Sequence, residues 1–179
     1  MRVARRRKSD EAWLHSRVRS QPMLLEPVPI TGEEDVLTLH GPRRALAEFY
    51  AAFNHGNLDG LARSWAHTDD VVMANPLGGI MRGWPEIRAV YERIVNGPAR
   101  VVVEFYDYAV HEAGDVFYAV GRERGELRNG STTFRLAIRT TRVFRRVDGQ
   151  WRQVHHHGSC DDPDLLARYQ AEVRSRADE

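Results

Sequence analysis

The chain has 179 residues, 42% hydrophobic side chains and a formal net charge of +1, which is typical of one globular domain with an appendage. No apolar run is long enough to cross a bilayer, and a single cysteine excludes an intramolecular disulfide framework and cysteine-clustered zinc. We therefore expect a cytoplasmic protein without a membrane partner.

The first 40 residues differ from the rest in charge and in pattern. Residues 1–20 carry a net charge of +5, whereas the remainder carries −4. Pro22, Pro27 and Pro29 favour an extended backbone, and no apolar segment follows the arginines as it would in a secretory signal. We interpret residues 1–40 as a flexible basic leader, 41–160 as the folded domain and 161–179 as a C-terminal helix. A basic arm can contact nucleic acid, but we expect a solvated leader and no such partner.

Three helices are predicted at the start of the domain. Pro42 suits a first helical position, Asn57 can cap a second helix, and Trp84 with Pro85 opens a third, which Gly97 ends. A short strand at 71–74 and a turn at Gly78 and Gly79 separate the second helix from the third. The apolar stripes are Leu46, Phe49, Tyr50 and Phe53 on the first helix, Leu58, Leu61 and Trp65 on the second, and Ile87, Val90, Tyr91 and Ile94 on the third.

Beyond the third helix the apolar period changes to two, which indicates strands. The predicted strands are 100–111, 115–124, 132–146 and 151–159, and Asp162 with Pro163 then begins a last helix. Helices followed by an antiparallel meander define an α+β fold, with the helices packed on one face of a curved sheet.

One charged residue interrupts the apolar face of the predicted strand 132–146. Phe134, Leu136, Ile138 and Phe144 share that face with Arg142. A buried guanidinium without a partner costs several kcal/mol, so Arg142 must meet a carboxylate, a ligand anion or water in a cavity. An internal acid such as Glu48 or Glu104 would make it a structural pair, whereas a cavity would make it a ligand contact.

Three consecutive histidines lie on the final strand, and alternation places His155 and His157 on one face and His156 on the other. A two-residue loop at Asp148 and Gly149 would put His155 opposite Arg142. A three-residue loop with Gly149 as a bulge would instead put Val154 there and His156 in the pocket.

Other chemistry has less support in the sequence. Two histidines on a strand can bind zinc, but a third ligand would have to come from His111, and we expect no metal. A Cys160 nucleophile beside His157 lacks an orienting third group. We expect no cofactor, because no phosphate-binding glycine loop is present.

The segment TRVFRRVDGQWRQVHHHGS at 141–159, together with the helix-helix-strand start, resembles the nuclear transport factor 2-like superfamily in its SnoaL-like branch. This resemblance covers about residues 42–159 and implies a cone-like curved antiparallel sheet, with three N-terminal helices on its concave face, and a homodimer. The segment also resembles the association domain of calcium/calmodulin-dependent kinase II, which implies that Arg142 lines a carboxylate pocket. A second pocket arginine of that domain falls on Gly158, which favours the bulged turn.

Residues 54–83 resemble ketosteroid isomerases, whose general base falls on Asn75 and whose oxyanion donor falls on Phe49. An amide cannot shuttle a proton at neutral pH, and a phenyl ring has no donor. Isomerisation by that mechanism is therefore not expected, although Asn75 can still contact a ligand.

Together these patterns predict a cavity between the helices and the sheet, lined by apolar and a few polar side chains. The candidate ligand contacts are Phe49, Trp65, Asn75, Tyr91, Arg142 and His156. We expect a small anionic or carboxylate-bearing metabolite, with His156 as the best acid or base for a cofactor-free isomerase, cyclase or lyase step. Whether a reaction occurs is open. The alternative is a non-catalytic dimerisation module, for which the cationic residues Arg135, Arg139 and Arg145 are an obstacle unless acids answer them.

Overall fold

The structure is a computed structural model that describes residues 24–174. Its elements, in chain order, are α1 (Gly41–Asn54), α2 (Leu58–Ser64), β1 (Val72–Ala74), β2 (Met81–Arg82), α3 (Gly83–Asn96), β3 (Arg100–Ala113), β4 (Val116–Asn129), β5 (Thr132–Val147), β6 (Gln150–Cys160) and α4 (Pro163–Arg174). The predicted helices and long strands are all present. The small strand β2 was not predicted.

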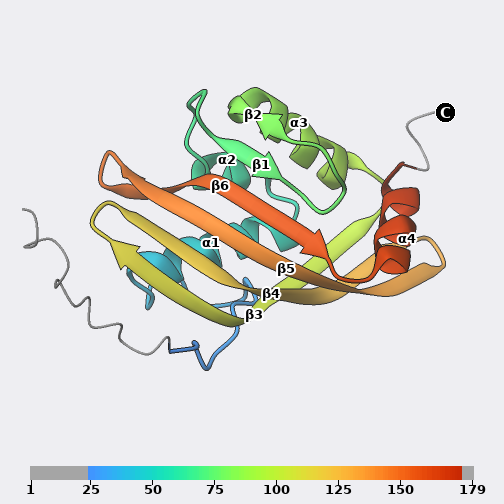
Figure 1. Cartoon of the computed structure of the whole chain (residues 1–179), viewed down its shortest axis with the longest axis horizontal. Helices are drawn as coiled ribbons and strands as arrows, with labels where there is room; N and C mark the ends of the chain where they lie inside the picture. Colours follow the sequence, from blue (N-terminus) through green and yellow to red (C-terminus); the bar gives the residue numbers. More distant parts are fainter. Residues whose placement is uncertain (1–23, 175–179) are drawn as a thin grey trace, which may run out of the picture.

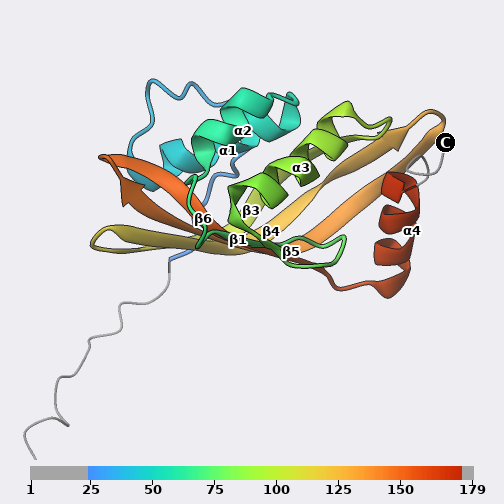
Figure 2. The same ribbon diagram turned by 90° about the horizontal axis from the view of Figure 1, so that it is seen from above.

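The six strands form one open sheet in the order β2-β1-β6-β5-β4-β3. The strands from β3 to β6 are an antiparallel meander, as predicted, but β1 runs parallel to β6 and makes the sheet mixed. Helices α1, α2 and α3 lie along one side of the sheet and α4 stands at its end (Figures 1 and 2). The predicted α+β fold with three helices on one face is therefore confirmed.

The helical layer follows from the predicted stripes and caps. Leu46, Phe49 and Tyr50 of α1 are at most 1% exposed and face the sheet. Gly56 takes a φ of 65°, which favours glycine, and ends α1, while the side chain of Asn57 accepts a hydrogen bond from the backbone of Gly60 and caps α2. These helices and the sheet enclose the core.

The stretch before α1 covers the free edge of β3. Ile30 is fully buried and exchanges two backbone hydrogen bonds with Phe105, of 2.8 and 2.9 Å. Glu26 donates a further backbone bond to Tyr108. Residues 26–30 thus satisfy groups that an edge strand would leave unpaired. The basic segment 1–20 lies outside the described residues.

A β-bulge interrupts the pairing of β3 with β4. Its register against β4 shifts between Tyr106 and Ala109, where Asp107 has a φ of 47°. Gly121 of β4 faces this bulge, and a Cβ there would lie 2.4 Å from the Cβ of Tyr108. Only a residue without a side chain allows the two strands to approach so closely.

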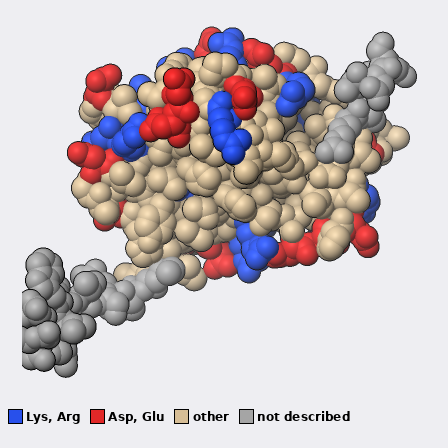
Figure 3. Space-filling view, turned by 45° about the horizontal axis from the view of Figure 1, so that its top comes forward, with Lys and Arg blue, Asp and Glu red and all other residues tan. Residues whose placement is uncertain are grey.

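Within residues 24–174, no helix is both long and apolar enough to span a membrane. On the side of the molecule in Figure 3, acidic and basic side chains are interspersed over the upper part and along the lower edge, with uncharged surface between them. That side therefore has no patch of a single sign that would attract an anionic polymer.

Candidate functional site

The pairing of β5 with β6 decides which histidine faces inward. Asp148 and Gly149 form a two-residue loop with φ values of 51° and 76°, as in a type I′ turn, and Val147 pairs with Gln150. The register then shifts beyond Phe144, which pairs with Gln153, so that Val154 is the extra residue of a bulge. Beyond the bulge, Arg142 pairs with His156.

Both sequence alternatives for the partner of Arg142 were therefore wrong. The two-residue loop does occur, but it does not bring His155 opposite Arg142, because the bulge at Val154 shifts the register by one residue. His156 and Gln153 consequently both lie on the inner face although they are three positions apart. His157 is exposed on the outer face.

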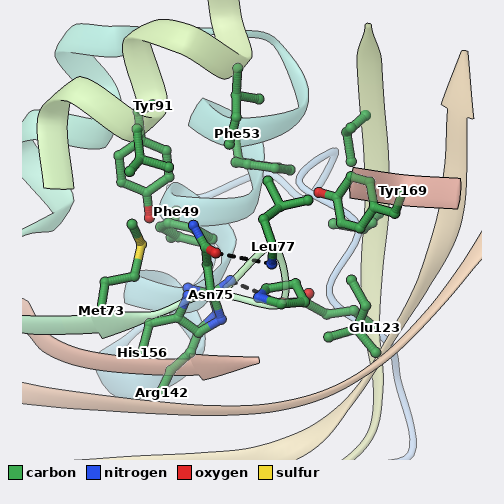
Figure 4. A pocket seen from close by; sticks show the side chains of 16 residues that line it. Phe49, Phe53, Met73, Asn75, Leu77, Tyr91, Glu123, Arg142, His156 and Tyr169 are labelled. Carbon is green, nitrogen blue, oxygen red and sulfur yellow. Dashed lines mark hydrogen bonds and ion pairs between the residues drawn. The ribbon is translucent and has the colours of Figure 1, made fainter. Parts of the chain in front are cut away.

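A partly closed cavity of about 50 Å³ lies between α1, α3 and the inner face of the sheet (Figure 4). Five of the six expected contacts line it, namely Phe49, Asn75, Tyr91, Arg142 and His156. The sixth, Trp65, is not among the lining residues. It lies behind the cavity wall and donates a 3.2 Å hydrogen bond from its Nε1 to the hydroxyl of Tyr91. The remaining wall is mostly apolar and includes Met73 and Leu77.

Arg142 is 3% exposed and donates a hydrogen bond from each of its three nitrogens to a side chain inside the fold. Its Nη2 donates to Oε1 of Glu123 at 2.9 Å, its Nη1 to Oε1 of Gln153 at 3.0 Å and its Nε to the hydroxyl of Tyr50 at 3.1 Å. The Tyr50 hydroxyl in turn donates to Glu123 at 2.6 Å. We call these four side chains, Tyr50, Glu123, Arg142 and Gln153, the buried network.

The internal acid is therefore Glu123 and neither of the two that the sequence suggested. Glu48 pairs with Arg44 on the surface of α1, and Glu104 pairs with Arg124. The period-two pattern of β4 could have predicted Glu123 as the internal acid. Glu123 shares the inner face of this strand with Phe117 and Ala119, which are both fully buried. The remaining members, Tyr50 and Gln153, were not predicted as site residues.

Aromatic rings complete the surroundings of the guanidinium. Its central carbon lies 3.8 Å from the ring centroid of Phe49 and 5.1 Å from that of Tyr50. Although burial opposes its charge, attraction to Tyr50 and Glu123 leaves the pKa of Arg142 above its usual value. Burial raises the pKa of Tyr50 well above its usual range and that of Tyr91 to about 12, so both phenols are neutral at pH 7.

His156 is a polar side chain of the cavity wall that is buried without hydrogen-bond partners in the described part of the chain. It is 7% exposed, and no described residue forms a hydrogen bond with either ring nitrogen. Burial, and then the charge of Arg142, hold its pKa well below the usual value, so the imidazole is neutral. A neutral imidazole has one donor and one acceptor, and leaving both unused in a folded interior is costly. The ring can therefore serve a guest molecule in the cavity.

The loop after β1 forms another part of the wall. The side chain of Asn75 accepts a 3.0 Å hydrogen bond from the backbone of Leu77, whose carbonyl oxygen accepts one from Gln170 of α4. Pro76 approaches Gly158 so closely that a Cβ on Gly158 would lie 2.9 Å from its Cδ. Pro76 thus occupies space that a side chain at position 158, such as a second arginine, would need.

The described residues contain no cluster of histidine, cysteine and acidic side chains that could hold a metal ion. His111 stacks on Tyr118 with their ring centroids 4.8 Å apart. Burial raises the pKa of Cys160, which disfavours the thiolate that a nucleophile would need.

Solved structures with this fold define its class. A candidate dehydratase of the NTF2-like family from Streptomyces avermitilis is 23% identical and aligns with a TM-score of 0.59 over 64% of this chain and 89% of its own. An NTF2-like protein of unknown function from Pseudomonas putida is 24% identical, with a TM-score of 0.59 over 69% of this chain and 87% of its own. The fold is that of the nuclear transport factor 2-like superfamily.

Within this class, a family model for the SnoaL-like domain matches residues 43–163, and the chain belongs to that family. A candidate calcium/calmodulin-dependent protein kinase type II association domain from Thiobacillus denitrificans is 29% identical, with a TM-score of 0.56 over 68% of this chain and 95% of its own. No curated protein matched the chain.

Proposed function

We propose that the chain binds a small, largely apolar molecule in the cavity between its helices and its sheet, with the polar end of that molecule at His156. The observation that carries this proposal is the buried imidazole, which no described residue hydrogen-bonds and which lines the cavity. A mostly apolar wall with few polar groups is the usual composition of a small-molecule site.

The size of the cavity limits its guest. Each water molecule needs about 10–15 Å³ of such space, so 50 Å³ accommodates a guest of only a few heavy atoms. A larger molecule requires the loop at 75–79 to move outward. Gly78 and Gly79, with φ values of 101° and 82°, supply backbone conformations in that loop that other residues rarely adopt.

The same geometry can support proton transfer. A neutral imidazole inside the cavity can take a proton from an acidic guest and return it at a second atom, which is the chemistry of an isomerase, cyclase or lyase step without a cofactor. Its lowered pKa makes it a weak base and, once protonated, a strong acid. Asn75 and Phe49 cannot supply the acid, base or oxyanion donor of the ketosteroid isomerase mechanism. We propose His156 as the wall group that would transfer the proton in any turnover.

A ligand screen on the full chain tests the proposal. Small carboxylic acids, their amides and aromatic polyketide-like molecules would be compared by thermal unfolding and by the imidazole NMR signals of His156. A ligand at 100 times its Kd stabilises the protein by about 2.7 kcal/mol. We expect such stabilisation in the wild type and in His157→Phe, the control on the outer face, and its loss in His156→Phe. No stabilisation by any ligand, or equal stabilisation in all three proteins, would contradict the proposal.

A second candidate function is self-association through the outer face of the sheet. Val116, Tyr118 and Val120 of β4 are between 36% and 46% exposed there and form an apolar strip. The outer-face arginines, whose charge opposes self-association, are partly neutralised by acids of the same chain. Arg139 pairs with Asp161 at 2.6 Å and Arg145 with Asp70 at 3.1 Å. An apolar centre with a charged, internally paired rim is typical of an interface.

We propose a homodimer with this strip at its centre. Sedimentation equilibrium of the wild type should give twice the chain mass of 20.5 kDa, and Tyr118→Glu should give the monomer mass. Leu37→Glu, which changes an apolar side chain that is 79% exposed and lies before α1, is the control and should remain dimeric. A monomeric wild type would exclude the proposed dimer.

A further inference from the structure

The charge of the cavity wall is already balanced by the protein itself. Arg142 carries the positive charge and Glu123 the negative charge of the wall, and their side chains are 3% and 7% exposed. Tyr50 and Tyr91 are neutral because burial raises their pKa values, and His156 is neutral because burial lowers its pKa. The titratable groups that line or support the cavity therefore sum to no net charge.

The guanidinium is also held in place by its partners. Each of its three nitrogens donates a hydrogen bond to a different member of the buried network. A carboxylate guest that paired with Arg142 in the way Glu123 does would have to displace Glu123. The displaced carboxylate would then be buried with only the hydroxyl of Tyr50 as its donor, at a large cost in desolvation.

No second cation compensates for this. Position 158 is glycine, and Pro76 lies against it. Both ring nitrogens of His156 are buried without a hydrogen-bond partner among the described residues, and a neutral imidazole can serve a carbonyl, hydroxyl or amide group with its donor and acceptor.

We infer that the cavity selects uncharged ligands, with an amide, carbonyl or hydroxyl group at their polar end, against carboxylates of the same shape, and that Glu123 is the residue that sets this selectivity. The inference rests on the proposed small-molecule site. It replaces the anionic ligand that the sequence suggested, because that expectation treated Arg142 as a cation without an internal acid. Glu123 acts as a built-in competitor for the guanidinium.

Matched pairs of ligands test the selectivity directly. Acetamide and acetate, isobutyramide and isobutyrate, and benzamide and benzoate differ little in shape but differ by one charge. Each would be titrated at pH 7 into the full wild-type chain, with the imidazole signals of His156 as the readout of binding in the cavity. We expect each amide that binds to do so about tenfold or more tightly than its carboxylate, because the buried anion finds no free cation in a wall whose one arginine is already paired with Glu123.

Exchange of Glu123 tests its role. Glu123→Gln keeps the shape and a hydrogen-bonding oxygen but removes the negative charge, so a carboxylate can then pair with Arg142. We expect the preference to reverse, with the carboxylate at least about tenfold tighter than in the wild type. Glu104→Gln is the matched control, since it also removes an acid that pairs with an arginine on the sheet, but outside the cavity. Its ligand preference should equal that of the wild type.

The outcomes separate the two proposals. Carboxylates that bind the wild type as tightly as their amides, with a response of His156, would overturn the selectivity and leave the small-molecule site intact. If no pair perturbs His156, the proposed site itself is wrong, and the selectivity with it. If Glu123→Gln folds but binds carboxylates no more tightly than the wild type does, Glu123 does not set the selectivity. If that variant does not fold, the wild-type pairs alone decide the question.

Discussion

Removal of one charge from the buried network should destabilise the fold far more than removal of a surface charge. Arg142→Met keeps much of the side-chain length but leaves Glu123 buried without its cation, and Glu123→Leu leaves Arg142 without its anion. Because both side chains are less than a tenth exposed, each single variant should lower the free energy of unfolding by about 3–5 kcal/mol. The whole free energy of unfolding of a typical domain is only about 5–15 kcal/mol.

The double variant separates the charge pair from the rest of the network. With neither charge present, the remaining cost comes from the hydroxyl of Tyr50 and the side chain of Gln153, which lose their partners. We expect the double variant to be more stable than the sum of the singles predicts, by about 3 kcal/mol. Adding Tyr50→Phe should recover part of the remaining loss, because it removes a buried hydroxyl without a partner.

Urea unfolding at pH 7, followed by tryptophan fluorescence and circular dichroism, measures these free energies. The surface pair of Arg44 and Glu48, with both side chains 47% exposed, is the control, and Arg44→Met should cost less than about 1 kcal/mol. Single variants at Arg142 and Glu123 that also cost less than about 1 kcal/mol would refute a tightly packed ion pair. A double variant equal to the sum of the singles would refute direct coupling.

Three further predictions concern His156 and the glycines. Below about pH 6.5 the unfolded chain takes up a proton at His156 that the folded imidazole resists, because burial lowers the pKa of the folded imidazole. Between pH 6.5 and pH 5 the free energy of unfolding of the wild type should therefore fall by up to about 2 kcal/mol more than that of His156→Phe. Urea unfolding across pH measures this difference, and parallel profiles would contradict it. Gly121→Ala inserts a Cβ 2.4 Å from a facing Cβ and should cost more than about 2 kcal/mol, whereas Gly114→Ala, which meets open space at a φ of 62°, should cost about 1 kcal/mol in thermal unfolding. Gly158→Ala should push Pro76 outward and shift the imidazole NMR signals of His156; unchanged signals would mean that the loop does not pack there.

Local physical chemistry was sufficient to predict most of the elements. The stripe of α1 and the cap at Asn57 depend on spacing and on a single side-chain oxygen, so they can be read without knowledge of any distant contact. The four long strands follow from their alternation in the same way. The two-residue strand β2 and the parallel pairing of β1 with β6 contain too few residues for a period to be visible, and only their neighbours in space define them.

In the candidate site, too, the sequence pattern predicted some features, and contacts between distant segments decided the others. Alternation along β5 placed Arg142 on the inner face, and burial then required a partner for its charge. The choice of that partner lay between strands, because Glu123 reaches Arg142 only through the register of β4 against β5. The inward position of His156 depended on a bulge at Val154, and a shift of one residue exchanges the two faces of a strand.

The amino-acid sequence by itself thus determined the helices, the long strands and the presence of a cation in the core, because propensity, periodicity and the cost of burial are properties of each segment. The tertiary structure decided that this cation is neutralised by the protein and that the imidazole of His156 lies in the cavity wall without a hydrogen-bond partner among the described residues. Those outcomes depend on contacts between residues that are far apart in the chain, and the pattern of a single segment does not contain them.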